Sequence, residues 1–109
     1  MSWKLEYLPE AVKDLKSLAG NQRLLVVKAI EKVRKNPLPD YEHELGKPLG
    51  NKSTRNLSGF LKIKLKNAEI CVVYQIKKTD TEMLVIVIGA RADDEVYDEA
   101  AKRIKKHNL

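Results

Sequence analysis

Hydrophobic residues alternate with lysines along residues 61–66, the pattern of a strand with one buried and one polar face. After a turn at Asn67 and Ala68, a second alternating segment runs over residues 70–76. Residues 83–88 are continuously apolar, which is typical of a strand covered on both sides. The pattern predicts a three-stranded antiparallel meander whose last strand is central.

The first part of the chain predicts one strand and two helices. Residues 3–7 alternate as a short strand that ends before Pro9. Apolar residues then recur at helical spacing from Pro9 to residue 19, and Gly20 is expected to end this first helix. Asn21 can cap a second helix that closes before Pro37. We expect the two helices to pack as a hairpin.

Residues 36–57 contain several prolines and glycines and show no clear period, so we predict a long loop there. Beyond Gly89, the acidic residues 93–95 open a final helix that ends in lysine and arginine, which matches the helix dipole at both ends. The predicted order is β-α-α-β-β-β-α, an α+β fold. With 109 residues, the chain is long enough for one core, so we expect a single domain over residues 1–109.

The charge balance favours an anionic partner, because 21 lysines and arginines against 15 acids leave a net charge of +6. The single cysteine, Cys71, cannot form an internal disulfide, and the N-terminus lacks the apolar run of a signal peptide. We therefore expect a cytoplasmic protein, and the longest apolar stretch is too short to span a bilayer. No metal-site spacing or cofactor motif is present, so no cofactor is predicted.

A basic element, residues 45–68, contains no acid and is predicted to bind a polyanion, RNA first. A two-residue turn would place Lys62 opposite Val73, Lys64 opposite Cys71, and Lys66 opposite Glu69. The first two lysines then have no carboxylate across from them. The alternative is a solvated face whose lysines protect the sheet from edge aggregation. Its cations are Lys47, Lys52, Arg55, Lys62, Lys64 and Lys66.

Arg91 and Tyr97 are expected to reach the same sheet face, since one follows the central strand and the other begins the last helix. Arginine can bind a phosphate with two hydrogen bonds, and tyrosine can transfer a proton or stack on a base. The alternatives are a loop ion pair for Arg91 and a packing role for Tyr97. His43 and His107 are not placed for acid–base catalysis, and Cys71 lacks a histidine base.

Three motifs carry a family resemblance: residues 57–65, residues 72–76, and the segment from Ile88 through Tyr97. With the helix pair, they make the chain resemble the RelE/ParE toxin superfamily over nearly its whole length, and most closely its RelE branch. The resemblance implies a microbial-RNase-like fold and a toxin of a type II toxin–antitoxin system. It also implies translation inhibition by ribosome-dependent cleavage of mRNA. A cognate antitoxin would be the protein partner, with operator DNA bound only through their complex.

By the same resemblance, Lys62 and Lys64 would stabilise the phosphorane and help to activate the ribose 2′-OH. Arg91 would hold the phosphate or assist the leaving 5′-oxygen. Tyr97 would orient or deprotonate the 2′-OH or stack on the mRNA. The remaining cations of the basic element, Lys47, Lys52, Arg55 and Lys66, are expected to contact the RNA backbone.

Cys71 departs from the RelE pattern, which has a second arginine at this place on the middle strand. A thiol cannot replace a bidentate cation, so catalysis is expected to be weakened and Cys71→Arg to raise it. Two alternative functions stay open: a ParE-like gyrase inhibitor without nuclease activity, and an impaired toxin homologue acting with its antitoxin in operator regulation. Arg91 and Tyr97 near the sheet favour the nuclease, whereas Cys71 favours the impaired homologue.

Overall fold

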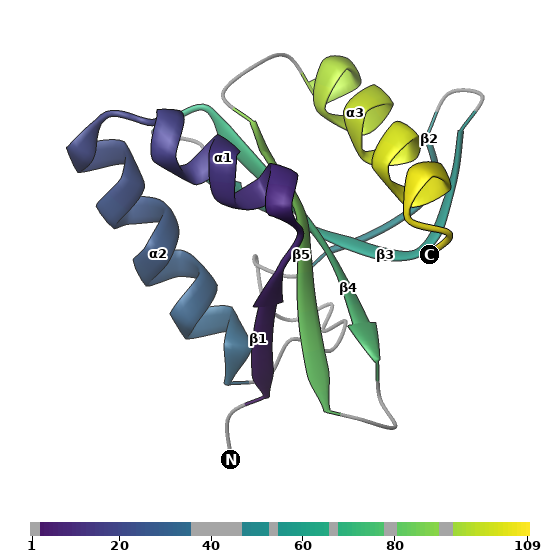
Figure 1. Ribbon diagram of the computed structural model, residues 1–109, viewed down its shortest axis with the longest axis horizontal. Coiled ribbons are helices and arrows are strands. Elements are labelled where there is room, and N and C mark those ends of the chain that lie inside the picture. Colours follow the sequence, from purple (N-terminus) through teal and green to yellow (C-terminus); the bar gives the residue numbers. More distant parts are fainter. Residues whose placement is uncertain (1–2, 36–46, 53–54, 66–67, 78–80, 90–92) are drawn as a thin grey trace.

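The computed structural model describes residues 3–35, 47–52, 55–65, 68–77, 81–89 and 93–109 (Figure 1). The fold is α+β, as predicted, with two helices after the first strand and one helix at the C-terminal end. In chain order its elements are β1 (Lys4–Tyr7), α1 (Pro9–Ser17), α2 (Gly20–Arg34), β2 (Lys47–Lys52), β3 (Arg55–Leu65), β4 (Ile70–Lys77), β5 (Glu82–Gly89) and α3 (Asp93–Lys106).

All five described strands form one sheet in the order β1-β5-β4-β3-β2. The predicted antiparallel meander is confirmed in β3, β4 and β5, and β1 joins β5 in parallel. The predicted register is also confirmed where it is described, because Lys62 pairs with Val73 and Lys64 with Cys71. Lys66, for which a pairing with Glu69 was predicted, lies outside the described residues.

The prediction of a long loop over residues 36–57 was wrong for its second part. The structure has strand β2 there, paired with the first half of β3, and residues 36–46 lie outside the described part. Pro48 and Gly50 suggested a loop, but the ladder shifts register between them, and β2 is an edge strand. An edge strand tolerates proline because one side of it needs no hydrogen-bond donor. Pro48 and Gly50 therefore mark an irregularity within β2.

The two helices were predicted correctly, but the junction between them lies before Gly20. Helix α1 ends at Ser17, and Gly20 is the first residue of α2, so neither Gly20 nor the predicted cap Asn21 separates the helices. The backbone N–H of Ala19 donates to the side chain of Gln22 at 3.4 Å and so helps to satisfy the start of α2. Arg23 of α2 donates to the carbonyl oxygens of residues 15, 16 and 18, which fastens the end of α1 to α2.

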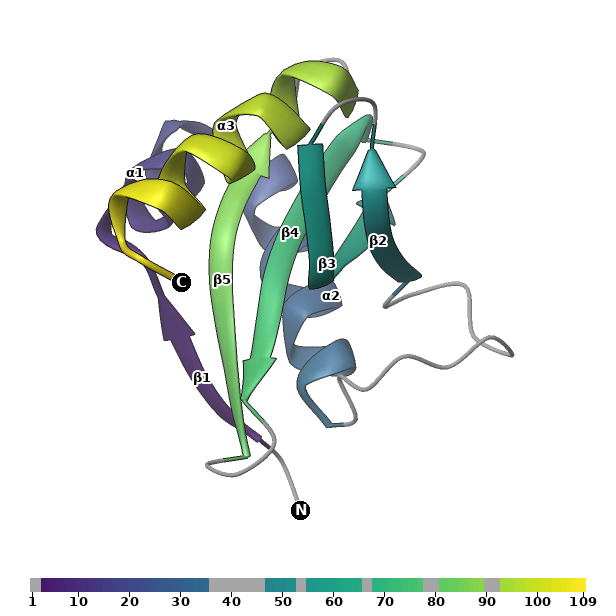
Figure 2. The same ribbon diagram turned by 90° about the vertical axis from the view of Figure 1, so that its right-hand side faces the viewer.

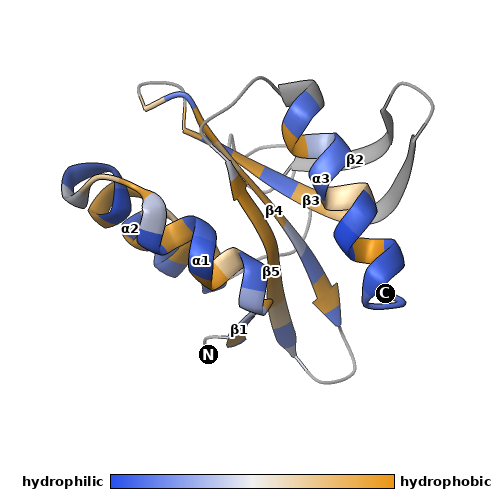
Figure 3. Ribbon diagram, turned by 45° about the horizontal axis from the view of Figure 1, so that its top comes forward, coloured by the Kyte–Doolittle hydropathy of each residue, from blue (hydrophilic) through white to orange (hydrophobic). Residues whose placement is uncertain are grey.

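The hydrophobic core lies between the sheet and the helices. Helices α2 and α3 cover opposite faces of the sheet (Figure 2). Strand β5 lies between β1 and β4 and is buried from Met83 onward, which confirms an apolar interior strand, but the middle strand of the five described ones is β4. The hydrophobic colouring of β5 contrasts with the polar outer surface of α3 (Figure 3). In the described part of the chain, no helix has both the length and the apolar character needed to cross a membrane.

Candidate functional site

Lys62 of β3 and Tyr97 of α3 meet on the α3 face of the sheet. The ammonium nitrogen of Lys62 donates a hydrogen bond to the Tyr97 hydroxyl oxygen at 3.0 Å and lies 5.7 Å from the centre of the ring. Tyr97 is 4% exposed, and Lys62 is half-buried. The structure therefore brings together two predicted catalytic side chains that come from separate elements of the fold.

Lys64 lies on the same face of β3 as Lys62, two residues further along the strand, and is also half-buried. Its register partner Cys71 lies between Lys64 on β3 and Gly89 on β5, and its exposure is 1%. Such burial makes the thiol inaccessible to an external reactant. Cys71 is therefore placed to pack beneath the cationic face.

The described parts of the basic element form an antiparallel hairpin. Strand β2 pairs with β3 so that Lys47 lies opposite Lys62 and Lys52 opposite Arg55 in the backbone register. Cations therefore occupy both members of these two pairs. The side chains of Lys47, Lys52 and Arg55 are outside what the structure describes, as are Lys66, Arg91 and His43 entirely.

Close packing at Gly89 brings the start of α3 against the end of β5. A Cβ atom built on Gly89 would lie 2.6 Å from the Val96 Cγ2 atom, which is too close for real carbon atoms. Val96 is fully buried and directly precedes Tyr97 in α3. The absence of a side chain at Gly89 thus allows the approach that seats Tyr97 against the sheet.

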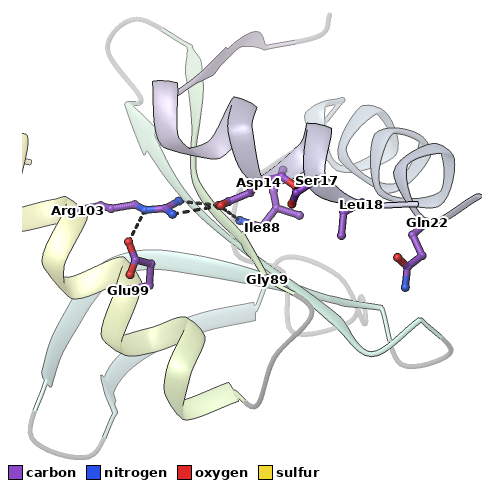
Figure 4. Close-up of a pocket in the computed structure, with 8 residues that line it drawn as sticks. All are labelled: Asp14, Ser17, Leu18, Gln22, Ile88, Gly89, Glu99 and Arg103. Carbon is purple, nitrogen blue, oxygen red and sulfur yellow. Dashed lines mark hydrogen bonds and ion pairs between the residues drawn. The ribbon is translucent and has the colours of Figure 1, made fainter. Parts of the chain in front are cut away.

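A partly buried ionic cluster, which the sequence analysis missed, joins α1, β5 and α3 (Figure 4). The Arg103 guanidinium donates to both carboxylate oxygens of Asp14, at 2.6 and 3.2 Å, and to the carbonyl oxygen of Ile86 at 2.9 Å. The Asp14 carboxylate also accepts from the backbone N–H of Ile88 at 3.1 Å. Glu99, one turn earlier in α3, accepts from Arg103 Nε at 2.9 Å. We call Asp14, Arg103 and Glu99 the α3 anchor.

Arg103 is only 7% exposed, although its charged neighbours in the sequence are typical of a solvated helix end. Burial alone lowers the pKa of Arg103, but its hydrogen bonds and charge attraction to Asp14, and then to Glu99, raise it above the ordinary value overall. One sequence signal could have found it: Arg103 continues the helical stripe of Val96 and Ala100, both fully buried.

An open cavity of about 560 Å³ lies beside the α3 anchor, between the ends of α1 and β5 and the side of α3 (Figure 4). Asp14, Glu99 and Arg103 line it, together with Ser17 and Gln22. Within the described ranges, no group of three or more His, Cys, Asp or Glu side chains could hold a metal ion. The cavity is a polar hollow between the helices, and neither Lys62 nor Tyr97 is among its lining residues.

His107 lies at the end of α3, where its Nε2 atom is 3.0 Å from a carboxylate oxygen of Glu10. Lys106 donates to the same carboxylate at 3.1 Å. The carboxylate with its two partners forms a second link between α1 and α3. These contacts give His107 a structural partner on α1.

The chain is similar to RelE toxins in sequence and in structure. The chain is 30% identical to the mRNA interferase toxin RelE of Escherichia coli over 104 residues, which cover 95% of this chain and 99% of that protein. A structure of a doubly substituted E. coli RelE in the free state has a TM-score of 0.74 at 28% identity, again covering 95% and 99%. The RelBE2 toxin–antitoxin complex of Mycobacterium tuberculosis shares the fold, with a TM-score of 0.67 at 22% identity, covering 85% of this chain and 95% of that one. No family model matches the chain. The identity to E. coli RelE, extending over nearly the full length of both proteins, shows that the chain belongs to the RelE toxin family.

Proposed function

We propose that this protein is the toxin of a type II toxin–antitoxin system and acts as a ribosome-dependent mRNA endonuclease. The contact between Lys62 and Tyr97 is the observation that carries this proposal. It places a cation and a proton-donating hydroxyl next to each other on one half-buried face, with Lys64 beside them. Membership of the RelE family and the mRNA interferase name of its E. coli relative support the same activity.

The proposed reaction is attack of the ribose 2′-oxygen on the adjacent phosphorus, with cleavage of the bond to the 5′-oxygen. The products are a 2′,3′-cyclic phosphate and a free 5′-hydroxyl. Negative charge develops on the phosphorane oxygens, and the ammonium groups of Lys62 and Lys64 stabilise that charge. Both cations are fixed on one strand, so little reorganisation is needed when the phosphate arrives.

Tyr97 has a defined role in this scheme, because its hydroxyl oxygen accepts a hydrogen bond from Lys62 and so lies beside a cation. We propose that the hydroxyl orients the 2′-OH, or that the phenolate form of Tyr97 takes the proton of the 2′-OH as its oxygen attacks, while the leaving 5′-oxygen takes a proton from Arg91 or water. The nearby ammonium stabilises the negative charge that forms on the phenol oxygen as the proton leaves. Unperturbed lysine and tyrosine titrate near pH 10, so we propose that the ribosome-bound mRNA supplies the orientation that makes proton transfer efficient.

Arg91 is the fourth catalytic residue that we propose, on the basis of its position in the RelE-like motif after Gly89. It would hold the scissile phosphate through two hydrogen bonds or assist the leaving oxygen. Primer extension on an mRNA translated by purified ribosomes tests this role. Arg91→Ala should remove the cuts seen with the wild type, and cuts that persist would exclude Arg91 from the reaction.

The other cations of the basic element would hold the RNA backbone. Our proposal assigns this role to Lys47, Lys52, Arg55 and Lys66. The register pairs of β2 and β3 support the assignment, because they concentrate cations along one hairpin. Replacing one of these residues by glutamine should weaken RNA binding for all sequences and reduce its salt dependence by about one unit of slope.

We propose a cognate antitoxin as the protein partner, with operator DNA reached only through the toxin–antitoxin complex. E. coli RelE, in the same doubly substituted form, has been solved with a peptide of its antitoxin RelB, and that toxin aligns with this chain at a TM-score of 0.66 and 28% identity. The basic surface suits an acidic partner segment. We place the protein in the cytoplasm, where translating ribosomes are found, and treat residues 1–109 as one toxin domain.

A second candidate function is supported by Cys71. Its small buried side chain occupies the middle-strand position at which the RelE pattern has an arginine, so one charge-stabilising donor is missing. A toxin homologue with weak nuclease activity that acts mainly with its antitoxin in operator regulation would tolerate this loss. The Lys62–Tyr97 contact favours the nuclease over this alternative and over a ParE-like gyrase inhibitor, which needs no such pair.

The test of the nuclease function compares Lys62→Gln with Lys28→Gln in the ribosome-coupled primer-extension assay. Both substitutions remove one lysine charge, but Lys28 is an exposed residue of α2, which covers the opposite face of the sheet. Cleavage should require ribosomes, fall strongly for Lys62→Gln and stay at the wild-type level for Lys28→Gln. Ribosome-independent cuts, or equal cleavage by the two variants, would contradict the proposed function.

A further inference from the structure

We propose that Asp14 and Arg103 are positioning residues for Tyr97: their partly buried ion pair fixes α3 on β5 so that the Tyr97 hydroxyl meets Lys62. This inference rests on the proposed nuclease function. Arg103 follows Tyr97 by six residues in the same helix, about 9 Å along its axis. Because a helix moves as a stiff element, a displacement of α3 at Arg103 displaces Tyr97 by nearly the same distance.

The α3 anchor bonds to backbone groups of β5 that lie beyond the last described pair of β5 with β1. The β1–β5 ladder ends at the pair of Tyr7 with Val85. Beyond it, the carbonyl oxygen of Ile86 accepts from Arg103, and the N–H of Ile88 donates to Asp14. These two bonds complete the edge of β5 where β1 has stopped. Their donors and acceptors fix one geometry, since a displaced side chain would leave a buried group without a partner.

The apolar contacts of α3 do not define its position in the same way. Val96 and Ala100 are fully buried, but they are small, and hydrophobic contacts have no direction. These contacts set how closely α3 approaches β5, as Val96 does at Gly89, but they supply no directional bond between the two elements. The fork of Arg103 supplies such bonds, because both of its terminal nitrogens bond to Asp14, and Glu99 holds Arg103 Nε from within the helix.

The second link between α1 and α3, at Glu10, is too exposed to fix the helix equally well. The side chains of Lys106 and Glu10 are 69% and 23% exposed, whereas those of Arg103 and Asp14 are 9% and 18% exposed. Exposed ion pairs are weakened by solvent and salt, and the pair at Glu10 has the more exposed cation. Of the two polar links between α1 and α3, the α3 anchor is therefore the one that better fixes the place of Tyr97, together with the close packing at Gly89.

The test uses the full-length protein labelled with 3-fluorotyrosine, which reports the surroundings of each tyrosine by ¹⁹F NMR. The Tyr97 signal is assigned by its loss in the Tyr97→Phe variant. The Lys62→Gln variant gives the chemical shift of that signal when no ammonium group lies beside Tyr97. Asp14→Asn, which removes one charge with almost no change in shape, should move the signal toward that chemical shift. Glu31→Gln is the matched control, because Glu31 forms an exposed pair with Arg34 on α2 and should leave the signal in place.

The kinetic part measures steady-state cleavage of ribosome-bound mRNA, which gives kcat and KM. Asp14→Asn should lower kcat on the order of tenfold to a hundredfold while KM for the programmed ribosome changes little, because Tyr97 is misplaced by a fraction of an ångström or more and the basic element is intact. Arg103→Lys keeps the charge but loses the fork, so it should move the signal in the same direction and lower kcat by a smaller factor. This milder variant keeps the test decisive if Asp14→Asn does not fold.

The two proposals fail in different ways. A Tyr97 signal that keeps its wild-type position in both anchor variants would overturn the positioning role, whatever the cleavage rate. A signal that moves while kcat stays unchanged would support the positioning role and contradict the part of Tyr97 in catalysis. A signal that moves together with a fall in kcat supports both proposals, provided that Glu31→Gln changes neither.

Discussion

The ammonium nitrogen of Lys62 lies 3.0 Å from the hydroxyl oxygen of Tyr97, a residue 35 positions further along the chain. The strand that carries Lys62 is fixed by its ladder with β4, whereas Tyr97 depends on how α3 is seated. The contact therefore exists only while three conditions hold together: the strand register, the close packing at Gly89 and the α3 anchor. Each condition can be tested separately.

Gly89→Ala should weaken both the fold and the nuclease. The new methyl group would lie 2.6 Å from Val96 Cγ2, and valine in a helix has almost no alternative rotamer with which to avoid it. The start of α3 must shift, at a cost of about 1–3 kcal/mol in the free energy of unfolding. Urea unfolding measures this loss, and ribosome-dependent cleavage should fall with it because Tyr97 follows Val96.

Gly20→Ala is the matched control for this substitution. No atom lies within 4 Å of a Cβ built on Gly20, and this glycine is the first residue of α2. Alanine there should raise the free energy of unfolding by up to about 1 kcal/mol, because it restricts the unfolded chain. Cleavage should keep its wild-type rate. Equal stability of the two alanine variants would show that the packing at Gly89 does not constrain α3.

Cys71→Arg should increase cleavage and decrease stability. An arginine beside Lys64 adds a bidentate donor for the phosphorane, which can raise the rate by up to about a hundredfold. The thiol that it replaces is 1% exposed, so the larger charged side chain must push past its neighbours at a cost of about 1–3 kcal/mol. Cleavage rates and thermal unfolding of the same preparation check both parts, and a rate at or below wild type would argue against the missing-donor explanation.

Protonation of Glu10 should lower the free energy of unfolding in acid. Its hydrogen bond with His107, a bond to its own backbone and its bond with Lys106 lower its pKa from 4.5 to about 2. Because the pKa is lower in the folded state, the stability contributed by Glu10 is complete above about pH 4.5 and is lost as the pH falls toward about 2. Urea midpoints at about pH 6 and about pH 3 should therefore differ less for Glu10→Gln than for the wild type. Parallel losses in the two proteins would show that Glu10 does not contribute in this range.

Much of the site was predictable because it lies on strands with strict alternation. A shift of one residue would turn the Lys62 face of β3 toward the core, so the pattern itself fixes which residues share a face. The short turn then fixed the pairing of Lys64 with Cys71, as the structure confirms. The catalytic roles of these residues came from the family resemblance and remain to be measured.

The parts that were missed depend on tertiary context. Strand β2 was mistaken for a loop because Pro48 and Gly50 interrupt its pattern, and only its place at the sheet edge permits them. Arg103 was predicted only as one of the basic residues that end the last helix, because its partner Asp14 is 89 residues away in the sequence. Local composition cannot distinguish a buried arginine from an exposed one when the pairing residue lies on another helix.

The most direct test of the nuclease function is the single-turnover rate of ribosome-dependent mRNA cleavage by Tyr97→Phe, with Tyr7→Phe as control. Both substitutions remove one hydroxyl, but Tyr7 lies on β1, at the opposite edge of the sheet from the basic hairpin. Loss of the Tyr97 hydroxyl should lower the rate by about a hundredfold, while Tyr7→Phe should cleave at the wild-type rate. Cleavage by Tyr97→Phe at the rate of the control would contradict the proposed role of the Lys62–Tyr97 pair.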